Sequence, residues 1–207
     1  MTRLVYERDA AAIYRQSFAT IRAEADLALV PADLEPVVVR MIHACGMTDL
    51  PALVAASPDV VAAARAALVA GRPVFCDSMM VANGITRARL PAPNPVRCTL
   101  QEPGIADDAR AAGTTRSAAA VDRWRPDLTG AVVVIGNAPT ALAELVSLPV
   151  QPALVVGLPV GFVGAAEAKA ALLRQGWPCI TNIGEKGGSA VAAAAVNALV
   201  GLVRETS

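Results

Sequence analysis

Histidine is the scarcest reactive side chain in this sequence, because His43 is the only one among 207 residues. Its ordinary pKa lies near neutral pH, so proton transfer at pH 7 would first be assigned to it. A lone histidine on a helix is, by itself, more typical of a structural residue than of a catalyst. The absence of a second histidine speaks against a metal centre built from His and Cys side chains.

Paired cysteines are also lacking. Cys45, Cys76, Cys98 and Cys179 are far apart in the sequence and form no C-x-x-C motif. They therefore fit neither a disulfide framework nor a zinc site. We interpret them as small buried hydrophobic residues, and we expect no bound metal.

Charge is scarce and balanced: charged residues make up 17% of the chain, and 18 basic residues offset 18 acidic ones. No run of Lys or Arg occurs, so nucleic acid is not an expected partner. The first residues include Arg, Glu and Asp rather than an apolar segment. The longest apolar stretch, residues 190–203, is short for a membrane span and contains Asn197. We therefore expect a cytoplasmic protein that does not enter the membrane.

The usual nucleotide and hydrolase motifs are missing. There is no Walker motif, and Gly157, Gly161 and Gly164 have the wrong spacing for G-x-G-x-x-G. There is also no G-x-S-x-G elbow. A flavodoxin-like nucleotide binder is therefore a weak alternative, which a flavin spectrum of the purified protein would support.

Small apolar residues are abundant: 55% of the chain is hydrophobic, but only 3% is aromatic. This balance is typical of a buried parallel sheet covered by Ala-rich helices. Short apolar runs predict strands at residues 73–76, 96–100, 131–135, 153–156 and 178–181. Helices are predicted over residues 9–26, 31–46, 57–71, 114–124, 141–148, 165–175 and 189–204, with a short one within 104–113. The predicted fold is a three-layer α/β/α domain over residues 1–207, with a mainly parallel sheet of about five strands.

In such folds, ligands bind beyond the carboxyl ends of the strands, so the segments after residues 76, 135, 156 and 181 should meet at one edge of the sheet. Basic residues occur near loop or helix ends, namely Arg40, Arg87, Arg89, Arg116 and Lys186. The N-terminus of the last helix, at Gly188 and Ser189, could receive a carboxylate. This edge suits a ligand that carries several carboxylates.

Several longer motifs occur in a fixed order along nearly the whole chain. They are Arg40-Met41-Ile42-His43-Ala44-Cys45-Gly46, Cys76-Asp77, Gly84-Ile85-Thr86-Arg87, Thr115-Arg116-Ser117-Ala118-Ala119, Ile135-Gly136-Asn137-Ala138-Pro139-Thr140, Gly157-Leu158-Pro159-Val160-Gly161-Phe162-Val163-Gly164 and Gly187-Gly188-Ser189. In these motifs the chain resembles the precorrin-8X methylmutases of cobalamin biosynthesis.

The resemblance implies a cofactor-independent isomerase that moves a methyl group on ring C of precorrin-8X to the neighbouring carbon, giving hydrogenobyrinic acid. It implies that His43 is the general acid and that the substrate contacts include Ser17, Arg40, Thr86 and Arg116. Arg87, Gly188 and Ser189 are further predicted substrate contacts, from their places at loop and helix ends. The resemblance also implies a homodimer with its site near the subunit interface.

Two alternatives to this reading stay open. One is a cobalt-precorrin-8 methylmutase of the anaerobic route, because the sequence does not distinguish a metal-free from a cobalt-bearing substrate. The other is a corrinoid carrier without turnover, which would not need His43.

Overall fold

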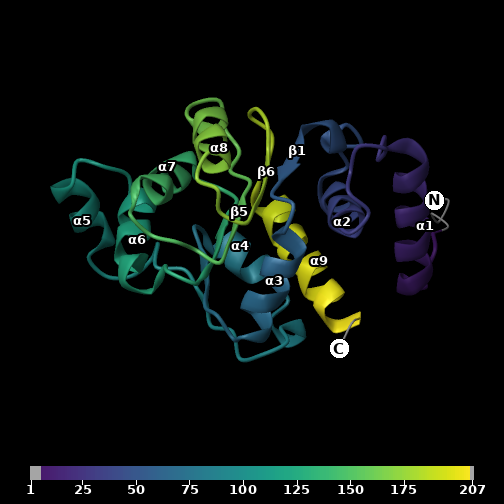
Figure 1. The fold of residues 1–207 in the computed structure, drawn as a ribbon, viewed down its shortest axis with the longest axis horizontal. Helices are drawn as coiled ribbons and strands as arrows, with labels where there is room; N and C mark the ends of the chain where they lie inside the picture. The colour runs from purple at the N-terminus through teal and green to yellow at the C-terminus, as the bar shows by residue number, and fades with distance from the viewer. Residues whose placement is uncertain (1–5, 206–207) are drawn as a thin grey trace, which may run out of the picture.

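The chain folds around one six-stranded sheet, described for residues 6–205 in a computed structural model (Figure 1). The strands are β1 (Val54–Ala56), β2 (Val74–Cys76), β3 (Val96–Arg97), β4 (Val132–Ile135), β5 (Leu154–Gly157) and β6 (Cys179–Asn182). Their order across the sheet is β1-β6-β5-β4-β2-β3. All neighbouring pairs are parallel except β1 with β6. This confirms the predicted mixed α/β architecture.

Helices occupy most of the remaining chain. They are α1 (Ala10–Glu24), α2 (Glu35–Cys45), α3 (Val60–Val69), α4 (Met79–Gly84), α5 (Ile105–Ala111), α6 (Arg116–Trp124), α7 (Pro139–Ser147), α8 (Ala165–Leu173) and α9 (Ser189–Glu205). Short 3₁₀ turns lie at η1 (Leu50–Leu53), η2 (Arg87–Arg89) and η3 (Arg125–Asp127). Within residues 6–205, no helix is long and apolar enough to cross a membrane.

Successive side chains of a strand point to opposite faces of the sheet, and helices cover both faces, which gives three layers. In β4, Val132 and Val134 enter a core shared with α2, α3, α4 and α9, whereas Val133 and Ile135 enter a core shared with α6, α7 and α8. All four side chains are fully buried, as expected for a central strand covered on both faces. Helix α1 lies outside these layers and packs on α2 (Figure 1).

The prediction of about five strands missed β1. This strand has only three residues, all half-buried, and it follows directly on η1. Its register places Ala55 opposite Thr181 of β6. Such a short edge strand carries too little hydrophobic periodicity to be recognised in the sequence.

Candidate active site

The loops that follow β2, β4, β5 and β6 leave the sheet at the same edge, because these four strands are parallel neighbours. The sequence predicted this arrangement. The connections diverge between β2 and β4: α4 packs on one face of the sheet, and α7 packs on the other. Neighbouring parallel strands whose connections diverge leave a crevice at their carboxyl ends, where α/β proteins bind ligands.

Asp77 connects the ends of β2 and β4 at this edge of the sheet. It follows β2, is 1% exposed, and accepts hydrogen bonds from the backbone N–H groups of Gly136 (3.1 Å), Asn137 (2.9 Å) and Ala138 (2.7 Å). Burial raises the pKa of Asp77, and the three backbone donors oppose this shift. The carboxylate therefore ties the turn after β4 to the end of β2.

The N-terminus of α9 lies against the same turn. A Cβ atom on Gly136 would stand 2.9 Å from Cα of Ser189, so only glycine allows this approach. Ser189 Oγ lies 3.4 Å from Ser78 Oγ, next to Asp77. The predicted carboxylate site at Gly188 and Ser189 thus lies at the carboxyl ends of β2 and β4.

Two further predicted contacts flank this region. Thr115, which caps the α6 helix that Arg116 begins, is hydrogen-bonded to Thr140 in the first turn of α7 (2.8 Å). The N–H of Thr86 donates to Asn197 Oδ1 of α9 (2.8 Å), which holds the segment after α4 against that helix. The side chains of Thr86, Arg87 and Arg116 are exposed.

His43 belongs to a second group, formed by α1 and α2. Its Nδ1 lies 2.8 Å from Ser17 Oγ, and its ring packs against Tyr14 and Phe18, with centroid distances of 5.2 and 5.3 Å. When Nδ1 accepts the Ser17 hydroxyl proton, the neutral ring carries its own proton on Nε2. Among the described residues, Nε2 has no hydrogen-bond partner. Ser17 therefore fixes the ring and leaves Nε2 for a ligand.

Arg40 places a positive charge beside this ring. Its guanidinium lies over the rings of Tyr14 (5.2 Å) and Phe18 (5.9 Å). Partial burial lowers the pKa of His43, and the charge of Arg40 lowers it further. The sequence left the sign of this shift open, because the C-terminus of α2 favours the protonated ring and Arg40 opposes it.

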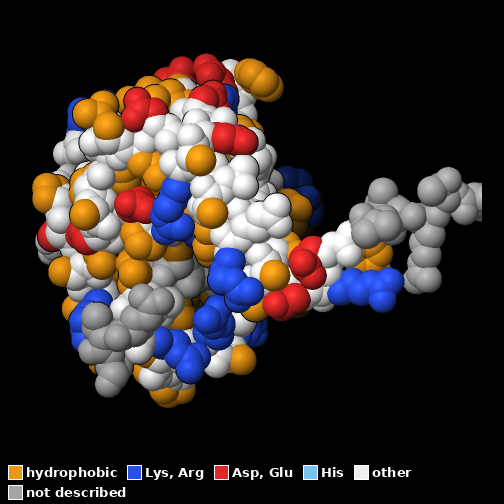
Figure 2. All heavy atoms as spheres, turned by 90° about the vertical axis from the view of Figure 1, so that its right-hand side faces the viewer, with side chains coloured by type: hydrophobic (Ala, Val, Ile, Leu, Met, Phe, Trp, Pro, Cys, Tyr) orange, Lys and Arg blue, Asp and Glu red, His pale blue; other side chains and the backbone are white. Residues whose placement is uncertain are grey.

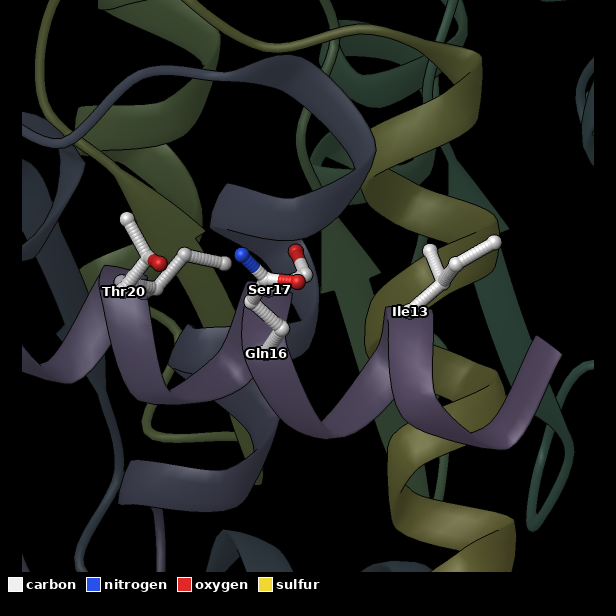
Figure 3. A pocket seen from close by; sticks show the side chains of 5 residues that line it. Ile13, Gln16, Ser17 and Thr20 are labelled. Atoms are coloured by element: carbon white, nitrogen blue, oxygen red, sulfur yellow. The ribbon is translucent and has the colours of Figure 1, made fainter. Parts of the chain in front are cut away.

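The hollow beside Ser17 has a wall on one side only (Figure 3). It measures about 340 Å³, and all of its lining residues come from α1: Ile13, Gln16, Ser17, Thr20 and Ile21. Exposed hydrophobic side chains, including Ile13 and Tyr14, lie on α1. Figure 2 looks onto this side of the molecule and shows Lys and Arg side chains among hydrophobic ones.

Within one chain, the structure does not gather all of the predicted site residues. Ser17, Arg40 and His43 form one group, whereas α6, which begins at Arg116, lies on the opposite side of the molecule (Figure 1). An ion pair between Lys186 and Asp49 joins the loop before α9 to the segment after α2.

Sequence reasoning missed the aromatic neighbours of His43 and the role of Asp77. Tyr14 lies three residues before Ser17 and four before Phe18, so the helical periodicity of residues 9–26 could have placed these three side chains on one side of the helix. Asp77 was visible only as part of a motif, because its three partners are backbone groups 59–61 residues away.

Comparison with known proteins agrees with this architecture. The family model for precorrin-8X methylmutase matches residues 12–202. A precorrin-8X methylmutase of Pseudomonas aeruginosa is 57% identical over 94% of this chain and 96% of its own. A cobalt-precorrin-8 methylmutase of Priestia megaterium is 37% identical over 79% of this chain and 75% of its own.

A solved structure described as precorrin-8X methyl mutase from Thermus thermophilus superposes with a TM-score of 0.87. It is 39% identical and covers 95% of this chain and 98% of its own. The chain therefore belongs to the precorrin-8X methylmutase family.

Proposed function

We propose that this protein is an isomerase of cobalamin biosynthesis that converts precorrin-8X into hydrogenobyrinic acid. Family membership supports the reaction. The observation that carries the assignment to a site is the oriented imidazole of His43, held by Ser17 at 2.8 Å beside the charge of Arg40. We also propose that the protein acts in the cytoplasm.

In the proposed mechanism, His43 is the general acid. In the protonated ring, Nδ1–H donates to Ser17 Oγ and Nε2–H gives its proton to the ring C nitrogen, which leaves His43 neutral. The proton on the ring C nitrogen withdraws electron density from the conjugated system and lowers the barrier to migration. The methyl group leaves one ring carbon and bonds to its neighbour within the same molecule. The ring C nitrogen then returns its proton to His43, so that the product is an isomer of the substrate and the acid is restored. A positioned acid contributes a factor of about 10² to 10⁴, so orientation of the substrate must supply much of the rest.

Unpaired cations suit the carboxylates of this substrate. Among residues 6–205, no carboxylate lies within ion-pairing distance of Arg40, Arg87 or Arg116. Arginine binds a carboxylate with two parallel hydrogen bonds, which fixes direction as well as position. We assign these three arginines, with Ser17, Thr86, Gly188 and Ser189, to substrate binding.

A second copy of the chain completes the proposed site. The hollow at Ser17 has one wall, and α6 lies far from His43 in the same chain. A two-fold dimer brings the α1–α2 group of one protomer to the crevice of its partner, and it covers the exposed Ile13 and Tyr14.

The proposed substrate is metal-free, because this chain is more similar to the precorrin-8X relative than to the cobalt-precorrin-8 relative. The test is to incubate the purified protein separately with precorrin-8X and with cobalt-precorrin-8, and to follow the visible spectrum. We expect faster conversion of precorrin-8X. Faster conversion of cobalt-precorrin-8 would overturn the metal-free assignment, and binding of both without conversion would identify a carrier.

A further inference from the structure

Lys169 is a buried basic residue outside the site described above. It lies on α8 but faces inward, and it is 1% exposed. Its Nζ donates to the backbone carbonyl of Lys186 (2.7 Å) and to Asn182 Oδ1 (3.4 Å). The amide of Asn182 also donates to the Lys186 carbonyl (2.8 Å). Two side chains thus bind one carbonyl of the loop between β6 and α9.

The charge of Lys169 has no adjacent counter-ion. Among the described residues, no carboxylate lies within 4 Å of its Nζ. Burial lowers the pKa of Lys169 to about 8, and Glu185 opposes this shift from a greater distance. A buried ammonium without a counter-ion destabilises the folded state, so packing alone does not account for a lysine at this position.

The bound carbonyl directly precedes the Gly187-Gly188-Ser189 motif. A Cβ atom on Gly187 would lie 2.3 Å from the carbonyl oxygen of Leu158, so this loop lies directly on the loop after β5. The N–H of Gly188 donates to the same Leu158 oxygen (2.8 Å). The chain then enters α9 at Ser189. The bound Lys186 carbonyl is thus three residues before the start of α9, in a loop that Leu158 also holds.

We propose that Lys169 is a positioning residue, which holds the loop between β6 and α9 so that Gly188 and Ser189 present the N-terminus of α9 to a substrate carboxylate. Its buried ammonium also places a positive charge behind that site, where it attracts the carboxylate. This inference rests on the proposed substrate contacts at Gly188 and Ser189.

The test compares wild type with Lys169→Met, which removes the charge and the donor, and Lys169→Gln, which keeps a donor without the charge. Arg174→Met is the control, because it removes an exposed cation from the end of the same helix. Methionine fills the buried space, and Asn182 still binds the Lys186 carbonyl, so both variants should fold.

For Lys169→Met we expect KM for precorrin-8X to rise roughly tenfold, the effect of losing one charge-assisted hydrogen bond that orders a binding loop, while kcat changes less. Lys169→Gln should lie between this variant and wild type, and the melting temperature of Lys169→Met should not fall, because a buried unpaired charge is removed. The control should match wild type.

An unchanged KM in Lys169→Met would overturn the positioning role, whether or not the melting temperature falls. The binding of hydrogenobyrinic acid, followed by its visible spectrum, gives a second measurement that needs no turnover. If wild type fails to convert precorrin-8X, the proposed reaction is wrong. A weaker affinity of Lys169→Met than wild type for hydrogenobyrinic acid would still support the role of Lys169.

Discussion

At the scale of single residues, the central feature is one imidazole whose two nitrogens are used differently. Nδ1 of His43 is held by Ser17, and the packing of Tyr14 and Phe18 restricts the ring plane. Arg40 stacks on the same two rings, so its charge is held beside the imidazole. The arrangement fixes the orientation of Nε2, which we propose as the proton donor.

Substitution of Ser17 tests this orientation. In Ser17→Ala the ring loses its hydrogen bond but keeps its aromatic contacts, so we expect kcat to fall roughly tenfold, as for the loss of one orienting hydrogen bond. Steady-state kinetics with precorrin-8X measure the change. Ser147→Ala, which removes an exposed hydroxyl on α7, is the control. An unchanged kcat in Ser17→Ala would show that Ser17 does not orient the acid.

The pH dependence follows from the lowered pKa of His43. The pKa of His43 in the free enzyme lies below the ordinary value for histidine. Since a general acid must be protonated, kcat/KM should fall as pH rises through this lowered pKa. Bound substrate carboxylates favour the charged ring, so the fall in kcat should occur at higher pH. Arg40→Gln removes the neighbouring positive charge, so in this variant kcat/KM should fall at a higher pH than in wild type. An unchanged pH dependence of kcat/KM in Arg40→Gln would contradict the assignment of His43 as the general acid.

At the scale of secondary-structure elements, the site depends on turns that are fixed by side chains from elsewhere. Asp77 holds the turn after β4, and Asn197 holds the segment after α4. In both cases one polar side chain satisfies backbone groups that no regular element could satisfy. The edge of the sheet is therefore ordered before any ligand arrives.

Removing Asp77 should destabilise the whole fold. In Asp77→Ala, three backbone N–H groups lose their acceptor, one of them buried and two partly buried. The free energy of unfolding should therefore fall by about 3 kcal/mol. Asp77→Asn keeps the shape and one acceptor oxygen, and it should lose less. Urea titration followed by circular dichroism measures both variants. A loss below about 0.5 kcal/mol in Asp77→Ala would refute the structural role.

The sequence predicted the elements whose signals are local. The apolar run of β4, the Pro and Gly that bound α2, and the glycine-rich turns before α8 and α9 all stand where the patterns placed them. The 2.8 Å contact between Ser17 and His43 joins two helices, and the Lys169 contact crosses from α8 to a later loop. Neither has a local signal, because both depend on how elements pack.

At the scale of the whole molecule, the chain carries two separate groups of proposed functional residues. The α1–α2 group holds His43, the proposed acid, and the other group holds Arg116 at the start of α6 and the N-terminus of α9 (Figure 1). A two-fold dimer makes two composite sites from four such groups. The abundance of small apolar residues is consistent with a chain that buries surface in such an interface.

Mixing two inactive variants tests the composite site. If His43 acts with Arg116 of the partner subunit, His43→Ala and Arg116→Ala should each be nearly inactive. After joint refolding, half of the dimers are mixed and each has one intact site, so about a quarter of wild-type activity should return. Recovery should require mixing at the unfolded stage. No recovery, together with dimers of mixed composition by native mass spectrometry, would place both residues in one protomer.

The most direct test of the central claim is single-turnover conversion of precorrin-8X by His43→Ala beside wild type, with substrate binding measured in the same samples. The account predicts conversion by wild type, and in His43→Ala retained binding with a rate at least about 10²-fold lower. Conversion at the wild-type rate by His43→Ala would contradict the account, because the oriented imidazole would then have no part in the reaction.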